Sequence, residues 1–105
     1  MPMWHRVLGE RHEADEEWER AIRCYLTALD QDPEDLETYF RLASVYARLG
    51  KDHQDLDLLE QAGRVGRAGR RRAKAESSWY AKFDRLLSEL QTHWEAAGGT
   101  FEESD

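Results

Sequence analysis

Cysteine, proline and the β-branched residues are scarce in this chain, and the scarcity excludes several classes of structure. A single Cys among 105 residues excludes a disulfide framework and any zinc site built from cysteine alone. Valine and isoleucine are few and never alternate with polar residues, so no β-strand is predicted. No apolar run approaches the ~18 residues of a membrane-spanning helix, and residues 1–17 lack the apolar core of a signal peptide. We therefore expect a cytoplasmic protein without a membrane partner.

The sequence also lacks the patterns that carry chemistry. It contains no Gly-rich phosphate loop, nucleophile motif or pair of carboxylates at a catalytic spacing. His5 and His12 are seven residues apart, whereas two metal ligands on one helix favour the i, i+4 spacing. Cys24 has no evident activating base beside it. The prediction is a protein without catalytic, cofactor-binding or metal-ligating residues, and therefore not an enzyme.

Charge is abundant and unevenly distributed. The net charge is -7, and residues 10–37, the acidic block, hold 11 acids against 3 bases. A basic run between residues 64 and 74 contains no acid and consists of Arg64, Arg67, Arg70, Arg71, Arg72 and Lys74. Such opposed blocks attract at short range, within one chain, between two chains or on a partner. Nucleic acid is favoured only by the basic run, because the net negative charge opposes it.

Apolar residues recur at the i, i+3, i+4, i+7 spacing of one helix face, which predicts helices throughout. The first helix places Trp4, Val7 and Leu8 on its apolar face. The other predicted helices cover residues 18–29, 36–49, about 53–65 and about 71–97. Pro33 should end the second helix, Asp35 is a candidate N-cap for the third, and Gly50 with Lys51 forms a C-cap signature. Gly63, Gly66 and Gly69 are expected in a joint between helices, with a close helix crossing as the alternative.

The sequence repeats itself with a period of 34 residues when residues 2–35 are laid on residues 36–69. Leu8 then falls on Leu42, Gly9 on Ala43, and Ala28 on Ala62. This pattern resembles the tetratricopeptide repeat (TPR), a helix–turn–helix unit with small residues where its helices cross. The matching residues are Leu8, Gly9, Trp18, Ala21, Tyr25, Ala28 and Pro33 in the first copy and Tyr39, Leu42, Ala43, Tyr46, Gly50, Leu59 and Ala62 in the second. Asp55 and Arg67 depart from the family pattern, which expects Ala and Pro there.

The resemblance implies an all-α fold made of two TPR-like hairpins, a fragment of a right-handed superhelix. A C-terminal helix at about 71–97 would cap the open end of the second hairpin. The prediction is one helical domain over residues 1–97, followed by an acidic tail at 98–105.

The resemblance also implies that the first helix of each hairpin lines a concave groove for a protein or peptide partner. That surface should carry Met3, Arg6, Glu10, Glu37, Phe40, Arg41, Ser44 and Arg48. Arg6, Arg41 and Arg48 around Phe40 are expected to take an acidic or C-terminal peptide, because guanidinium groups pair carboxylates bidentately. The predicted function is therefore a non-catalytic protein–protein interaction module.

The C-terminal helix carries more apolar residues than one contact face needs. Trp79, Phe83, Leu86 and Leu90 suffice to cover the second hairpin. Tyr80, Leu87 and Trp94 then form a second line at heptad spacing, which predicts a homodimer seam and a self-associating structural unit as the alternative function. The competing interpretation is that these three residues fold back onto the chain's own first helices.

Overall fold

The computed structural model describes residues 2–99, with side chains from Trp4 onward, and consists of helices and short connections in that range. Met1, the Met3 side chain and residues 100–105 of the predicted tail lie outside the described residues. The helices are α1 (Pro2–Ala14), α2 (Trp18–Gln31), α3 (Leu36–His53), α4 (Leu56–Arg72) and α5 (Ser78–Ala96). No strand occurs between residues 2 and 99, so the predicted all-α class is confirmed.

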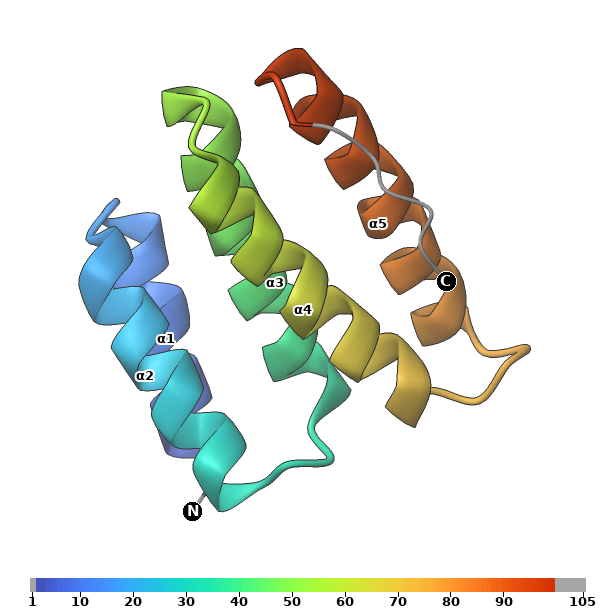
Figure 1. Ribbon diagram of the computed structural model, residues 1–105. Helices are drawn as coiled ribbons and strands as arrows, with labels where there is room; N and C mark the ends of the chain where they lie inside the picture. The colour runs from blue at the N-terminus through green and yellow to red at the C-terminus, as the bar shows by residue number, and fades with distance from the viewer. Residues whose placement is uncertain (1, 100–105) are drawn as a thin grey trace.

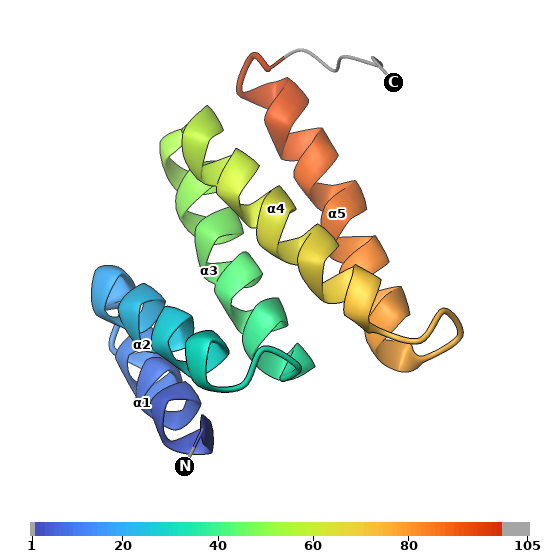
Figure 2. The same ribbon diagram turned by 60° about the horizontal axis from the view of Figure 1, so that its bottom comes forward.

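The helices form two stacked antiparallel hairpins and a single closing helix (Figure 1). α1 pairs with α2, α3 pairs with α4, and α2 packs against α3 to join the two hairpins. α5 lies along α4, as Figure 2 shows from a second direction, and it also contacts α3. The described chain measures 40 × 32 × 19 Å, so every helix remains near the surface.

Two core clusters hold these layers together. One lies between the hairpins and contains Ala21, Tyr25, Leu42 and Val45. The other joins α3, α4 and α5 through Ala43, Leu59, Ala62, Leu86 and Leu90. The small side chains of Ala21 and Ala28 are 0% and 1% exposed, as expected for positions where helices cross closely.

The apolar face predicted for α1 is only partly buried. Trp4 and Val7 are 59% and 53% exposed, although the spacing placed them on the inner face with Leu8. The reason is the position of α1 at the end of the stack: one side meets α2, and within residues 2–99 no further helix layer covers the opposite side. Exposure of these two residues corrects the prediction from periodicity.

Helix boundaries follow the capping chemistry in part. α2 ends at Gln31, shortly before Pro33, as predicted. Asp35 occupies the N-cap position of α3, but its carboxylate accepts hydrogen bonds from Thr38 Oγ1 at 2.7 Å and from Arg6 Nε at 3.2 Å. At α4 the N-cap is Asp55, whose carboxylate accepts from two backbone N–H groups of the first turn. Asp55, which stands where the family pattern has a small Ala, thus caps the N-terminus of α4.

Gly50 does not end α3. The helix continues to His53, and Gln54 takes the left-handed conformation at φ 49° and ψ 46°. Gly50 is buried, and a Cβ atom built on it would lie 2.7 Å from Cγ and 2.9 Å from the backbone nitrogen of Leu59. Its role is therefore to let α4 approach α3, and the predicted C-cap was wrong.

The glycines at 63, 66 and 69 do not form a joint either. All three lie inside α4 and are buried, and α4 runs on to Arg72. α5 begins only at Ser78, whose N-cap Ser77 accepts from the N–H of Tyr80. A Cβ on Gly66 would meet Leu87, and one on Gly69 would fall on Phe83, so the alternative of a close helix crossing is confirmed.

Candidate functional site

A line of surface hollows follows one face of α3 and corresponds to the predicted groove. A hollow of ≈ 280 Å³ lies between α3 and the start of α5, and a second of ≈ 270 Å³ lies between α3 and the remainder of α5. Ser44 lines both of them. A third hollow of ≈ 320 Å³ lies where α1 and α2 meet α3, and Arg41 and Arg48 line it. We call these three hollows together the groove.

Two predicted groove arginines are held in an ion-pair cluster that bridges α1 and α3. Arg6 pairs with Glu10 at 3.0 Å and with Glu37 at 3.1 Å. It also pairs with Asp35, which precedes α3, at 3.2 Å. Arg41 pairs with Glu37 at 3.0 Å and with Glu10 at 3.2 Å. The structure thus brings Arg6, Glu10, Glu37 and Arg41 together, but as one another's partners.

The cluster favours the charged form of both arginines. Burial alone would lower the pKa of Arg6, but the carboxylates of Glu37, Asp35 and Glu10 outweigh it and raise that pKa. Burial likewise opposes the charge on Arg41, but the hydrogen bond that Arg41 donates to Glu37 and the negative charge of Glu10 raise its pKa. Both guanidinium groups are therefore satisfied before any partner arrives.

Carboxylates outnumber arginines around the end of the groove where α1 and α2 meet α3. The cluster holds two arginines and three carboxylates. Glu13 and Glu16 line the adjoining hollow, and the Glu13 carboxylate accepts a 2.6 Å hydrogen bond from the Tyr25 hydroxyl. A partner's carboxylate would meet this excess, whereas a partner's ammonium or guanidinium group would be attracted by it.

Arg48 stands apart from the cluster. Its guanidinium lies 5.3 Å from the ring centroid of Trp18 and 3.7 Å from the carboxylate of Asp52. The side chain is 61% exposed and borders two of the hollows. The predicted trio of arginines is therefore divided between two environments.

Aromatic side chains form the wall between α3 and α5. Phe40 makes edge contacts with Trp79 and Phe83, at centroid distances of 6.0 and 5.7 Å. The Lys82 ammonium lies 4.6 Å from the Trp79 ring centroid. Trp79 and Lys82 line the ≈ 280 Å³ hollow together with Phe40, and sequence reasoning assigned neither of them to the groove. Their i, i+3 spacing was a usable signal, because it places both on one face of α5.

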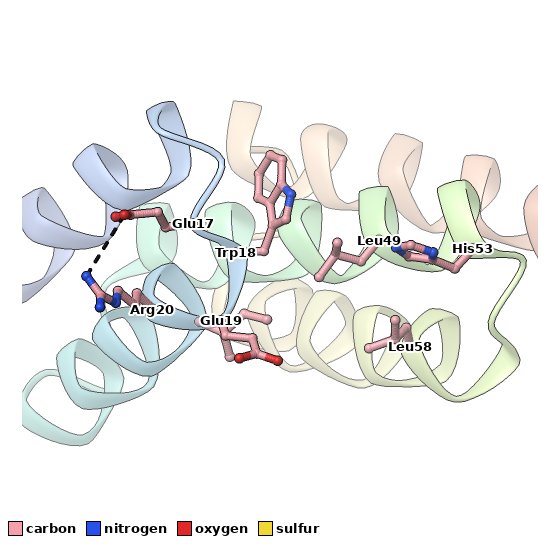
Figure 3. A pocket seen from close by; sticks show the side chains of 8 residues that line it. Glu17, Trp18, Glu19, Arg20, Leu49, His53 and Leu58 are labelled. Carbon is pink, nitrogen blue, oxygen red and sulfur yellow. Dashed lines mark ion pairs between the residues drawn. The ribbon is translucent and has the colours of Figure 1, made fainter.

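A hollow of ≈ 590 Å³, larger than each of the three groove hollows, lies outside the groove at the junction of α2, α3 and α4 (Figure 3). Its apolar wall includes Trp18, Leu49 and Leu58, and its rim carries Glu17 and Arg20, which form the long 3.9 Å ion pair drawn in Figure 3. The Glu17 carboxylate also lies 2.7 Å from His12 Nδ1. This hydrogen bond lowers the pKa of Glu17.

The basic run divides into engaged and free side chains. Arg70 pairs with Asp84 at 2.6 Å and lies over the Tyr80 ring, and Arg72 lies over the Tyr39 ring. Arg64 pairs with Glu60 at 3.5 Å. Among the described residues, no ion pair joins the basic run to the acidic block.

The residues of the predicted dimer seam are partly buried by contacts within the chain. Tyr80, Leu87 and Trp94 are each half-buried. Leu87 and Trp94 pack at the edge of the α3–α4–α5 core, Leu87 opposite Gly66 of α4. The backbone N–H of Gly99 donates to the Trp94 carbonyl at 2.9 Å. Leu87 thus packs on α4, and Arg70 of α4 lies over the Tyr80 ring, while homodimer formation stays a prediction.

Candidate sites of other kinds find no support in the described part of the chain. No group of three or more His, Cys, Asp or Glu side chains there could hold a metal ion. Between residues 2 and 99, no helix is both long and apolar enough to cross a membrane.

The helix arrangement and the groove define an α-helical repeat protein, and comparison with known proteins specifies its kind. Residues 14–50 match the family model described as TPR repeat. The solution NMR structure of a tetratricopeptide repeat domain protein from Salinibacter ruber superposes with a TM-score of 0.61 at 24% identity, covering 100% of this chain and 94% of that one. No curated protein matches the chain. The resemblance is confirmed: residues 14–50 are similar to the tetratricopeptide repeat, and the chain has the fold of a tetratricopeptide repeat domain.

TPR domains are in general protein–protein interaction modules and are typically non-catalytic. The matched segment spans the end of α1, all of α2 and most of α3, so it straddles both hairpins. The division into repeats at 2–35 and 36–69 stays a prediction.

Proposed function

We propose that this chain binds a segment of a partner protein in the groove and carries out no chemistry itself. The observation that carries the proposal is the run of hollows along α3, two of which share Ser44. α1 and α5 flank α3 on this face, so the groove has a wall from each neighbouring layer of the stack. Its length and open shape suit an extended or helical segment better than a small molecule.

The partner segment, in this proposal, presents an apolar side chain and a nearby cation. The apolar side chain would enter the ≈ 280 Å³ hollow beside Phe40 and Trp79. The cation would meet the acidic excess of Glu10, Glu13 and Glu16 in the neighbouring hollow. The sequence-based prediction of an acidic peptide depended on free arginines, and two of these are paired within the chain. The proposed partner therefore carries the opposite charge.

A displayed library of random peptides tests this proposal. Peptides selected on the wild-type chain are measured against Ser44→Arg, which places a long side chain between two hollows. The control is Gln61→Arg, which adds the same charge at an exposed position of α4. We expect Ser44→Arg to weaken binding at least about tenfold and the control to leave it unchanged. Equal binding to both variants would place the site elsewhere, and selected peptides of acidic character would refute the charge assignment.

A further inference from the structure

A stripe of exposed cations runs along the outer face of α4, away from the groove. Arg64, Arg67, Arg71 and Lys74, which we call the α4 stripe, follow one another at spacings of 3, 4 and 3 residues. That spacing places Arg64, Arg67 and Arg71 on one face of α4, and Lys74 follows just after the helix ends. All four are exposed, and no residue of α4 lines the three groove hollows.

The structure shows which of the run's charges remain available. Arg70 and Arg72, from the same run, are turned toward α5 and toward Tyr39 respectively and are engaged there. Among the described residues, the side chains of Arg67, Arg71 and Lys74 have neither an ion pair nor a hydrogen bond. Arg64 shares one carboxylate, that of Glu60, at 3.5 Å. The net charge of the stripe is thus at least +3 on a chain of net charge -7.

We propose that the α4 stripe is a second docking surface, which binds a short acidic segment of a partner protein. Arginine pairs carboxylates in a planar, bidentate geometry, and three of the four cations are arginines. A partner helix with Asp or Glu at spacings of 3 and 4 residues would place one carboxylate opposite each of Arg64, Arg67 and Arg71, and a further acid three residues on continues toward Lys74.

The length of the stripe favours a short protein segment over a long polyanion. Arg64 and Arg71 are seven residues apart, which is about 10 Å at ~1.5 Å per residue of helix, and Lys74 follows two residues after the end of α4. Glu60 precedes the stripe and Glu76 follows it, and both are exposed. A nucleic acid that continued past either end would meet these carboxylates and an acidic molecule beyond them. An acidic segment of a few residues ends within the stripe.

The contact should be weak and sensitive to salt. Exposed ion pairs contribute little individually, and added salt screens them over about 10 Å or less. If one segment of a partner is already bound in the groove, a second, acidic segment of the same partner has a high effective concentration near the stripe. Several ion pairs along the stripe then add to the affinity for the whole partner. The stripe therefore suits a partner that binds at two places.

Fluorescence anisotropy on the full chain tests the proposal. The probes are a labelled peptide of about twelve residues with Glu at the 3, 4, 3 spacing, its Gln counterpart, and a short duplex DNA. Of the three probes, we expect only the Glu peptide to bind. Its affinity should fall at least about tenfold when NaCl is raised from about 50 to 300 mM. The double change Arg67→Glu, Arg71→Glu should abolish this binding.

The matched control is Arg20→Glu with Arg23→Glu, which alters the net charge equally on the exposed surface of α2. It should retain binding of the Glu peptide. The groove variant Ser44→Arg should also bind the Glu peptide, so loss of the peptides selected for the groove and loss of the Glu peptide are distinguishable results. Circular dichroism checks the fold of each variant, and Arg67→Gln with Arg71→Gln replaces the Arg67→Glu, Arg71→Glu variant if that one unfolds.

Four results would overturn the proposal. They are no binding of the Glu peptide by the wild type, equal loss in the α2 control, tighter binding of DNA than of peptide, and a concentration-dependent mass that only the α4 variant removes. The third result would assign the stripe to nucleic acid, and the fourth to the acidic block of a second copy.

Discussion

Two buried glycines of α4 should respond in opposite directions to the same substitution. A Cβ built on Gly69 falls on Cζ of Phe83 and lies 2.9 Å from Cβ of Tyr39. Phe83 is fully buried, so its ring can move aside only by displacing the core. A Cβ built on Gly63 has Arg67 atoms as its nearest neighbours, the first at 3.1 Å, and this exposed side chain can swing away.

The magnitudes follow from two opposing effects. Alanine is favoured over glycine by about 1 kcal/mol inside a helix, and this gain applies at both positions. Overpacking a core costs about 1–3 kcal/mol. The overpacking at Gly69→Ala should fall in the upper part of that range, because the new methyl group also clashes with Cβ of Tyr39, which cannot move without the backbone. We expect Gly63→Ala to stabilise by about 0.5–1 kcal/mol and Gly69→Ala to destabilise by about 1–2 kcal/mol.

Urea unfolding and thermal melts followed by circular dichroism measure both variants. A change of 1 kcal/mol in the free energy of unfolding moves Tm by about 4–8 °C in a domain of this size. The Tm values of the two variants should therefore differ by more than about 8 °C. If Gly69→Ala proves as stable as Gly63→Ala, the close approach of α5 to α4 at this position is refuted.

Three further predictions concern stability. Asp55→Ala should lower the free energy of unfolding by about 1 kcal/mol in urea titrations, because it removes the cap of α4, whereas Asp55→Asn should retain it. Ala28→Leu should cost about 1–3 kcal/mol, and an unchanged melting temperature would contradict the register of α2. Burial raises the pKa of Tyr25, Tyr39 and Tyr46, and the hydrogen bond and charge of a carboxylate raise that of Tyr25 further. The folded state then holds these protons more tightly, so stability is fully present below about pH 10 and falls above it; a constant urea midpoint from about pH 8 to 11 would contradict this.

Local sequence signals predicted the helices well and their ends less well. Pro33 marks the end of α2 reliably, because proline restricts the backbone of the residue before it. Glycine is ambiguous, because it serves both as a left-handed helix end and as a place where another helix approaches. Gly50 and Gly69 serve the second purpose, and only the position of Leu59 or Phe83 in space reveals it.

The groove could be predicted in outline from the repeat. The period places Glu37, Arg41 and Ser44 along one face of a first helix, and the structure finds them lining the groove. Glu37 and Arg41 also stand at the i, i+4 spacing at which opposite charges pair on one helix, and the structure shows this pair at 3.0 Å. The pairs that cross from α1 to α3 depend on the distance between two hairpins, which no local pattern encodes.

The order of the layers has a consequence for motion. In the part of the chain that the structure describes, the α3–α4 hairpin has neighbours on both sides, whereas the α1–α2 hairpin and α5 each have one. In a linear stack, stability is shared between adjacent units, so either end can open while the middle stays folded. Amide hydrogens of α3 should therefore exchange with solvent most slowly. When α5 opens, the groove loses the wall that holds Trp79, so a ligand bound there would resist that opening and slow exchange in α5 more than in α3.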